Sequence, residues 1–397
     1  MSEPPAVSRL RVGFYVFFPS GGIGRYTHEL MRALGRHAGV EVEVLCSPDF
    51  EWKRDPSYRA WEGLWTLSHP VPVLRRANFV IGQFVNPRRA IDYVRAQGID
   101  VLHLANVNHL TFPLWRRALD ESGVPVVLSA HDIRRQKPIL HRGWEERQLQ
   151  AFYRRADALF VHSRYQEREL IDFAGVAPER IHVVPHGPYP HRPVRRAREE
   201  IRAGLGLPAD RPVALFFGQL RDEKNLDGFL EAMARAGDHL YLLVAGASSS
   251  RHRDGPFYRK RARQLGLERR VMFLDRFIEE EEVGELFVAS DWVALPYRED
   301  FTSQSGVLNV AAHYRRPVLV SSAPVLRETV ETCDIGVVAP GDTVEALVEG
   351  IRRMNERLAA GHAHAFEAYE RHYSWERNAE ITLSVYRQLL GQAVGVR

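Results

Sequence analysis

Cysteine and long apolar runs are scarce in this sequence, and each shortage limits what the protein can be. Cys46 and Cys333 are the only cysteines among 397 residues, so a disulfide framework is excluded and a reducing cytoplasm is the expected compartment. No apolar run at the N-terminus or later is long enough for a signal or membrane-spanning segment. Lysine occurs only at positions 53, 137, 224 and 260, a bias towards arginine that is typical of a GC-rich genome.

Motifs for metal and nucleotide triphosphate chemistry are also missing. No D-x-D sequence and no His/Cys/Asp/Glu cluster with metal-ligand spacing occurs, and no G-x-x-x-x-G-K-[ST] loop is present. We therefore expect no metal cofactor and no NTPase reaction. Residues 1–190 carry a net charge of +5 and the remainder −1, which is too modest a basic surplus to indicate nucleic-acid binding.

What the sequence does contain is a repeated alternation of short apolar runs and helical patterns. The runs in the first half are 12–18, 40–45, 101–104, 124–128, 159–161 and 181–184, and those in the second half are 213–217, 240–244, 271–274, 292–295 and 318–320. Near-continuous apolar strands are typical of parallel sheets covered on both faces. The pattern predicts two doubly wound, Rossmann-like α/β domains that face a central cleft.

A stretch rich in proline and arginine, Gly187–Glu200, has the composition of a linker. The sequence therefore predicts an N-terminal domain over residues 1–190 and a C-terminal domain over 191–372. Residues 373–397 are expected to form a C-terminal helix, which could return to the N-terminal domain.

In the first predicted domain, two strand ends carry candidate binding residues. Gly22, Ile23 and Gly24 follow the first strand and open a helix, where backbone amides can approach a phosphate or a sugar. A dinucleotide fingerprint fits poorly because Thr27 stands at its third glycine position, so a nicotinamide enzyme is a weak alternative. His131 follows the strand 124–128 and is expected at the cleft edge of the sheet.

The second predicted domain has two candidate anion sites at its strand ends. Gly218 is followed by Arg221 and Lys224, two cations that suit a diphosphate, although surface pairing with the neighbouring acids is an equal reading from spacing alone. The segment 302–306 precedes a helix whose first amides attract an anion. Its candidate donor-binding residues are Thr302, Gln304, Ser305, Gly306 and Val307.

The stretch from Pro48 to Arg89 is the least regular part of the sequence. Its tryptophans, Trp52, Trp61 and Trp65, lie among several basic residues, so it is the candidate site for a glycan or an anionic carrier. The alternative is a loop packed by its own aromatic side chains.

The order of the motifs resembles the retaining family 4 glycosyltransferases of the GT-B fold, group 1 type, over nearly the whole chain. The matching segments are 21–30, 130–132, 156–163, 179–187, 216–224, 289–291, 304–308 and 316–318. The resemblance implies that the C-terminal domain binds a nucleotide diphosphate sugar and the N-terminal domain an acceptor. It also implies that Arg221 and Lys224 neutralise the diphosphate and that His131 contacts the donor sugar.

One departure from the family pattern concerns the donor site. Such enzymes commonly carry two glutamates eight positions apart near this helix, and here those positions read Thr302 and Val310. Glu299 and Asp300 lie just upstream and could replace the first carboxylate, whereas a valine at 310 cannot accept a ribose hydrogen bond. The resemblance still places Val310 facing the ribose, so Val310 is also a candidate donor-binding residue.

The function expected from these features is retaining, metal-independent transfer of a sugar to a glycan, lipid-linked or small-molecule acceptor. A cytoplasmic protein with a peripheral membrane contact through its N-terminal domain is compatible with this reading. The alternatives are a catalytically silent GT-B partner that binds nucleotide or glycan, and a nucleotide-sugar epimerase of similar fold.

Overall fold

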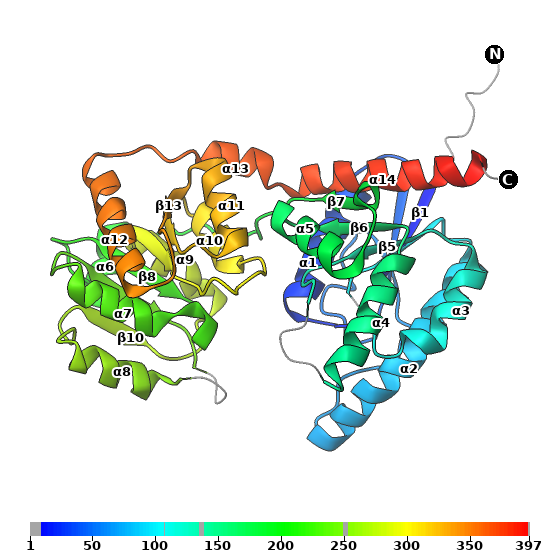
Figure 1. Ribbon diagram of the computed structural model, residues 1–397, viewed down its shortest axis with the longest axis horizontal. Helices are drawn as coiled ribbons and strands as arrows, with labels where there is room; N and C mark the ends of the chain where they lie inside the picture. Colours follow the sequence, from blue (N-terminus) through cyan, green and yellow to red (C-terminus); the bar gives the residue numbers. More distant parts are fainter. Residues whose placement is uncertain (1–8, 107, 135–138, 249–252, 396–397) are drawn as a thin grey trace, which may run out of the picture. The chain divides into compact units, whose positions relative to one another are not determined.

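The computed structural model describes residues 9–106, 108–134, 139–248 and 253–395, with no side-chain description beyond Gly391. The chain divides into two compact units (Figure 1). Unit 1 combines the residues up to His186 with those from Ser374 onward, and unit 2 is Gly187–Tyr373. Among the described helices, none is both long and apolar enough to cross a membrane.

Unit 1 is built on a seven-stranded parallel sheet in the order β3-β2-β1-β4-β5-β6-β7. Its strands are β1 (Leu10–Tyr15), β2 (Val40–Leu45), β3 (Arg59–Trp61), β4 (Val101–Leu104), β5 (Val126–Ser129), β6 (Ala158–Val161) and β7 (Ile181–Val183). The central strands β4, β5 and β6 are buried at every position, because helices cover both faces of the sheet.

The helices of unit 1 include one from the far end of the chain. They are α1 (Gly21–Gly35), α2 (Pro72–Gln97), α3 (Phe112–Ser122), α4 (Arg142–Arg155), α5 (Arg164–Ala174), the short 3₁₀ helix η1 (Pro178–Arg180) and α14 (Trp375–Gly395). α14 packs along α1. The Asn378 amide in α14 donates to the Tyr26 hydroxyl at 2.9 Å and to the Pro185 carbonyl at 2.7 Å.

Unit 2 has a six-stranded parallel sheet in the order β10-β9-β8-β11-β12-β13. Its strands are β8 (Val213–Phe217), β9 (Tyr241–Ala245), β10 (Val271–Leu274), β11 (Trp292–Leu295), β12 (Val318–Val320) and β13 (Gly336–Val338). Its helices are α6 (Arg198–Leu205), the 3₁₀ helix η2 (Asp222–Lys224), α7 (Leu226–Arg235), α8 (Gly255–Gln264), α9 (Glu280–Ala289), α10 (Gly306–His313), α11 (Pro324–Cys333), α12 (Val344–Ala359) and α13 (Phe366–His372). Two apolar clusters form its core.

The predicted fold class, two doubly wound parallel-sheet domains, is confirmed. The least regular stretch of the sequence, 48–89, is helical from Pro72 onward, where α2 begins, so the alternative of a packed loop applies only to the residues before it. The sequence does not show the pattern of a typical globular helix here, because the first turns of α2 expose apolar side chains and Pro87 lies in its interior. The edge strands β3 and β13 were also missed. β3 reads Arg-Ala-Trp and β13 Gly-Val-Val, so neither shows the apolar run that marks the equally short β7 and β12.

Candidate active site

The end of β8 in unit 2 brings together residues that the sequence separates widely. Gly218 has φ +92°, and a Cβ atom placed on it would lie 2.9 Å from Lys224 Nζ and 3.6 Å from Val307 Cγ2. This positive φ and the lack of space both require glycine. Lys224 and Val307 therefore both lie beside Gly218 at the carboxyl edge of the sheet.

Lys224 is held over this edge by η2. Its ammonium donates to the Phe217 carbonyl at 3.2 Å and lies 5.7 Å from the centre of the Tyr297 ring. Burial, reinforced by the Arg221 guanidinium, lowers the pKa of Lys224 to about 8. Because the protein neutralises little of its charge, the Lys224 ammonium is available to bind an anionic ligand.

Arg221 lies at the same edge but is more exposed. Its Nε donates to Gln219 Oε1 at 2.9 Å, and its Nη1 is 3.5 Å from Glu223 Oε1. The surface pairing considered as the alternative therefore occurs, in part, with Glu223. Because the side chain is half exposed, this pair contributes little to stability and can be exchanged for a phosphate.

The start of α10 adds hydrogen-bond donors beside these cations. Ser305 is its N-cap and is buried, yet its side chain caps no amide and instead lies 3.3 Å from the Tyr297 hydroxyl. Within the described chain, the amides of Gly306 and Val307 are not used by any hydrogen bond. Tyr297, which sequence reasoning missed, thus connects Lys224 to the first turn of α10.

The two positions that depart from the family pattern have different surroundings. Thr302 and Gln304 are half-buried in the loop before α10. Val310 is 8% exposed and belongs to an apolar cluster of unit 2. Upstream, Glu299 is exposed and accepts a hydrogen bond from the Ser322 hydroxyl.

In unit 1, the predicted glycine turn forms the start of α1. Gly21 has φ +80°, Gly22 is exposed with open space around its Cα, and Ile23 is half-buried. A Cβ on Gly24 would lie 2.9 Å from Trp52 Cζ3. Close packing against Trp52 therefore explains the glycine at 24, while open space at Gly22 leaves room for a ligand.

His131 lies beyond the end of β5 in a cluster of buried aromatic rings. Its Nδ1 is 3.0 Å from Nε2 of His162, and its ring contacts Tyr26 edge-on at 4.7 Å between centroids. Gln166 binds both histidines through the backbone, donating to the His131 carbonyl and accepting from the His162 amide, each at 2.8 Å. His131 Nε2 is buried and has no hydrogen-bond partner among the described residues.

Burial keeps these imidazoles neutral. It lowers the pKa of His131 to about 3, assisted by nearby His186, and it lowers the pKa of His162 well below its ordinary value. A neutral His131 can donate or accept a hydrogen bond but is no acid at physiological pH. His162 was not predicted, because only the fold brings β6 next to β5.

The tryptophans predicted for the acceptor are all engaged within unit 1. Trp52 stacks on His28 with ring centroids 5.4 Å apart, and Trp61 stacks on Tyr93 at 4.2 Å. Trp65 donates to Asn78 Oδ1 at 3.2 Å. Each ring is half-buried, so the structure shows the packing that was weighed as the alternative, and an acceptor role for these rings stays a prediction.

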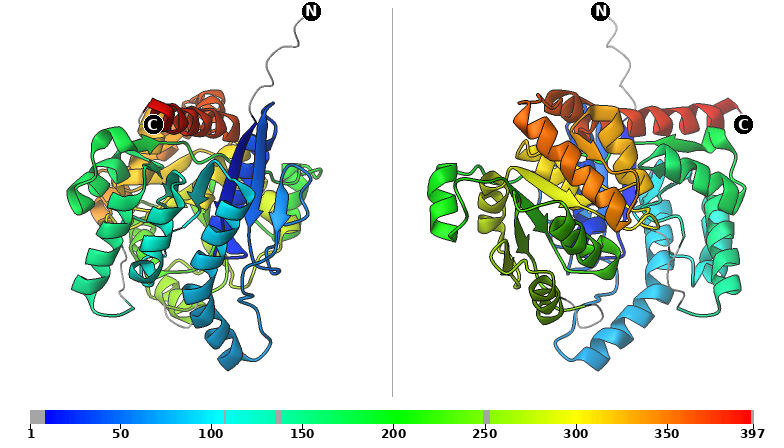
Figure 2. Two further views of the ribbon diagram at one scale, coloured as in Figure 1. Left: turned by 90° about the vertical axis from the view of Figure 1, so that its right-hand side faces the viewer. Right: turned by 60° about the vertical axis from the view of Figure 1, so that its left-hand side comes forward.

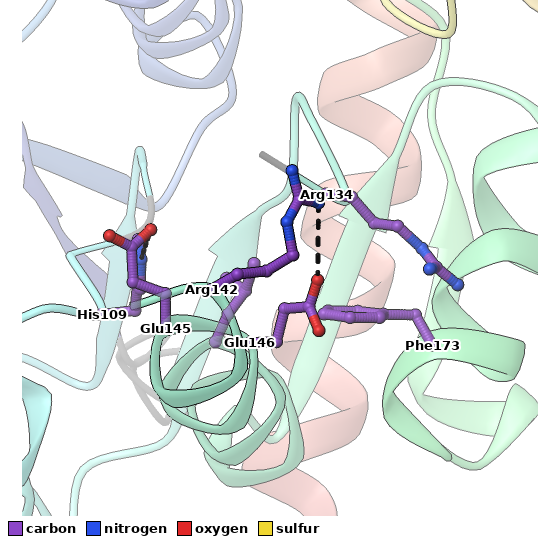
Figure 3. Close-up of a pocket in the computed structure, with 7 residues that line it drawn as sticks. His109, Arg134, Arg142, Glu145, Glu146 and Phe173 are labelled. Atoms are coloured by element: carbon purple, nitrogen blue, oxygen red, sulfur yellow. Dashed lines mark ion pairs between the residues drawn. The ribbon is translucent and has the colours of Figure 1, made fainter. Parts of the chain in front are cut away.

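A shallow pocket that sequence reasoning missed lies elsewhere in unit 1 (Figure 3). Glu145 and His109 are buried side by side, with Oε2 and Nε2 3.9 Å apart. Arg142 lies 3.8 Å from Glu146, and the Arg134 guanidinium lies 4.7 Å from the Phe173 ring centre. Both arginines point away from the buried pair and could meet an anionic group.

One group in unit 2 has side chains suited to a metal ion. Asp334, His362 and His364 have ligand atoms within 4.8 Å of one another. These three residues do not form a recognisable metal-binding motif in the sequence, because Asp334 lies far upstream of the two histidines. Its carboxylate already binds Arg357 Nη1 at 2.7 Å and His362 Nε2 at 3.0 Å.

Two protein families match the chain, one in each half. Residues 20–192 match the family described as Glycosyltransferase Family 4, and residues 197–372 match the family described as Glycosyl transferases group 1. Together the two matches cover nearly all of unit 2 and most of unit 1, leaving β1 and α14 outside.

Curated relatives carry a related description. A D-inositol 3-phosphate glycosyltransferase from Xylanimonas cellulosilytica is 28% identical, over 93% of this chain and 92% of its own. The enzyme of the same description from Mycobacterium tuberculosis is 30% identical over 60% of this chain and 50% of its own.

Solved structures show the same fold at low identity. A sucrose-phosphate synthase from Thermosynechococcus elongatus has a TM-score of 0.73 at 20% identity, covering 97% of this chain and all of its own. Anabaena HepE in complex with UDP-glucose has a TM-score of 0.67 at 18% identity, covering 95% of this chain and 99% of its own.

Proposed function

The chain belongs to the group 1 glycosyltransferases of the GT-B fold, and we propose that it transfers a sugar from a nucleotide diphosphate sugar with retention of configuration and without a metal ion. The acceptor is a glycan, a lipid-linked sugar or a small molecule. The observation that carries the proposal is that Lys224 and Val307 both lie beside Gly218 at one sheet edge.

The donor's diphosphate would bind where these residues meet. Lys224 and Arg221 supply positive charge, and the amides of Gly306 and Val307 supply donors from the start of α10. The phosphate gains negative charge as the glycosidic bond breaks, so these groups stabilise the transition state more than the bound donor. His131 stays the predicted contact of the donor sugar, consistent with its buried, unpartnered Nε2 among the described residues.

Metal independence follows from the same groups, because two side-chain cations serve the role that a divalent ion plays at other diphosphate sites. Retention is proposed from a front-face reaction in which the departing phosphate oxygen accepts the acceptor's proton. Such a reaction needs no protein base.

The acceptor is defined less sharply than the donor. The relatives described as D-inositol 3-phosphate glycosyltransferases act, by that description, on a phosphorylated polyol. A phosphorylated acceptor would suit Arg134 and Arg142 in the pocket of Figure 3. The half-buried Trp52, Trp61 and Trp65 are the alternative sugar platform.

The first experiment identifies the donor. A panel of nucleotide sugars, beginning with UDP-glucose because the Anabaena neighbour binds it, is screened for a rise in melting temperature and for slow hydrolysis. With that donor, Lys224→Ala and Arg221→Ala should each lower kcat/KM by on the order of 10²-fold. Lys260→Ala, at an exposed position of α8, is the matched control and should be silent.

Two further readouts test the chemistry. Transfer should survive EDTA, and NMR of the product should show the donor's anomeric configuration. Folded Lys224 and Arg221 variants that transfer sugar at the wild-type rate would remove the diphosphate role. An inverted product, or activity that EDTA abolishes and Mn²⁺ restores, would contradict the proposed mechanism.

A further inference from the structure

The first half of α2 exposes large apolar side chains to solvent. Residues 71–77 are exposed on every side of the helix. We call the following residues the α2 stripe, with their exposed fractions: Val73 (71%), Leu74 (47%), Val80 (54%), Ile81 (38%) and Phe84 (53%). An exposed apolar group of this size usually marks an interaction surface.

The stripe occupies one side of the helix. At 100° per residue, its members fall within an arc of about 120°. The opposite side packs on unit 1, where Gly82 and Asn86 are buried and Phe79 contacts Phe17 with ring centroids 5.6 Å apart. α2 is thus anchored by one face and presents the other outward.

The shape of unit 1 makes this surface prominent. The N-terminal turns of α2, drawn in light blue, extend beyond the other elements of unit 1 in every view (Figures 1 and 2). A projecting helix tip with an apolar side can enter a planar surface without hindrance from its neighbours.

The charges around the stripe have a single sign. Residues 63–91 contain Arg75, Arg76, Arg88 and Arg89 and no Asp or Glu. Within the described part of the chain, Arg75 and Arg76 pair with no carboxylate. At 100° per residue, Arg76 lies about 40° from the edge of the stripe, whereas Arg75 lies on the side of Gly82 and Asn86. An apolar helix face bordered by an unpaired arginine is a combination that binds anionic lipid headgroups.

We propose that the α2 stripe, with Arg76 at its edge, docks the protein on an anionic membrane surface. A second copy of the chain is a poorer occupant, because pairing two stripes would bring the same arginines together. The surface is independent of the sugar-transfer proposal, since docking needs neither donor nor acceptor.

Vesicle binding by the full-length protein tests the inference directly. The protein should co-sediment with vesicles of phosphatidylcholine and phosphatidylglycerol in equal parts, and much less with pure phosphatidylcholine. Raising the salt concentration should weaken the binding, because the headgroup attraction is screened.

Matched variants assign the binding to α2. An arginine near the surface is worth about five-fold in partition, so Arg75→Gln with Arg76→Gln should weaken binding by at least about five-fold, through the loss of Arg76. Arg116→Gln with Arg117→Gln changes the same residue types on α3, where both side chains are exposed and face acids, and should have little effect. Melting temperatures should be unchanged in both pairs.

A fluorescent label reports whether the stripe itself enters the lipid. Cys46 and Cys333 are buried, so Leu74→Cys supplies the reactive thiol for an environment-sensitive dye. Its emission should shift to the blue on adding anionic vesicles. Leu114→Cys, at a 69% exposed leucine of α3, should show no shift.

Several results would overturn the inference. The inference is wrong if the protein binds neutral and anionic vesicles equally well. It is also wrong if the α2 and α3 arginine variants lose the same binding affinity, or if the dye at position 74 shows no blue shift. A dimer in light scattering that Leu74→Gln dissociates, together with no vesicle binding, would assign the stripe to a second copy instead.

Discussion

At the scale of single residues, the unusual ionisation of Lys224 leads to a measurable pH dependence. Burial lowers its pKa to about 8, so in the unliganded protein the ammonium loses its proton as the pH rises through 8. A bound diphosphate favours the charged form. Affinity for a nucleoside diphosphate should therefore fall about tenfold between pH 7 and 9, because proton uptake must accompany binding.

Calorimetric titration with UDP at pH 7, 8 and 9 measures this dependence. Lys224→Arg is the matched control, since arginine keeps its charge throughout this range, and it also reports any effect of the ligand's own ionisation. If the UDP affinity of the wild type and that of Lys224→Arg change equally with pH, Lys224 does not titrate at the diphosphate site.

Val310 provides the second prediction at this scale. Its side chain is 8% exposed and lies in an apolar cluster, so Val310→Glu places a carboxylate in apolar surroundings. We expect a loss of about 1–3 kcal/mol in the free energy of unfolding, and no gain in nucleotide affinity. Thermal melting and UDP titration of Val310→Glu and the uncharged Val310→Gln check this, with a smaller loss expected for glutamine.

The opposite result would be equally informative. Val310→Glu that keeps its melting temperature and binds UDP several-fold tighter would place the ribose beside this position, where related enzymes carry a glutamate.

The sequence predicts a site residue only where that residue lies close to the end of a predicted strand or the start of a predicted helix. Gly218, Lys224 and Val307 were predicted because each directly follows a strand or opens a helix, and parallel strands end at one edge. Tyr297 lies 5.7 Å from Lys224 and His162 lies 3.0 Å from His131. Tyr297 belongs to no local motif, and His162, although it lies in the matching segment 156–163, was not singled out as a site residue. Their positions depend on which strands are neighbours, and a single sequence does not show that.

At the scale of secondary structure elements, α14 stabilises unit 1 through buried polar contacts. His103, fully buried in β4, lies between the Tyr386 hydroxyl at 2.5 Å and the Ser129 hydroxyl at 2.8 Å. Tyr386→Phe should lower the free energy of unfolding by about 1–3 kcal/mol, because it leaves the imidazole Nδ1 without its partner.

Denaturant unfolding of unit 1 measures this loss. Tyr241→Phe in β9 is the matched control, because the Tyr241 hydroxyl makes no hydrogen bond within the described residues. Equal stability of Tyr386→Phe and wild type would show that the contact with His103 contributes nothing.

The bounds of strands were predicted correctly where burial makes the sequence a short, continuous apolar run. β8, β10, β11 and β12 have the predicted bounds, because each of these strands is apolar throughout. β2 also has the predicted bounds, although its valines alternate with Glu41 and Glu43. α2 failed that test because its first half exposes apolar side chains, so that it does not show the polar outer face of a typical globular helix.

At the scale of the whole molecule, the two units differ in how the chain builds them. Unit 2 is continuous from Gly187 to Tyr373, whereas unit 1 needs the chain's last segment, from Ser374, to complete it. Trp375 and Asn378 both contact Tyr26 in α1, the first with ring centroids 5.2 Å apart and the second by a hydrogen bond. Unit 1 thus depends on both ends of the sequence.

This asymmetry predicts separate responses to truncation. A chain that ends at Tyr373 loses α14 and uncovers Tyr26, so unit 1 should melt at a lower temperature while the transition of unit 2 is unchanged. If the donor's diphosphate binds at Gly218 and Lys224, UDP affinity should stay within about twofold of wild type, whereas transfer should be lost with the integrity of unit 1. Scanning calorimetry and UDP titration of the truncated chain measure the two effects. Loss of UDP binding while the unit 2 transition persists would show that nucleotide binding needs an intact unit 1, and the donor site proposed for unit 2 alone would then be incomplete.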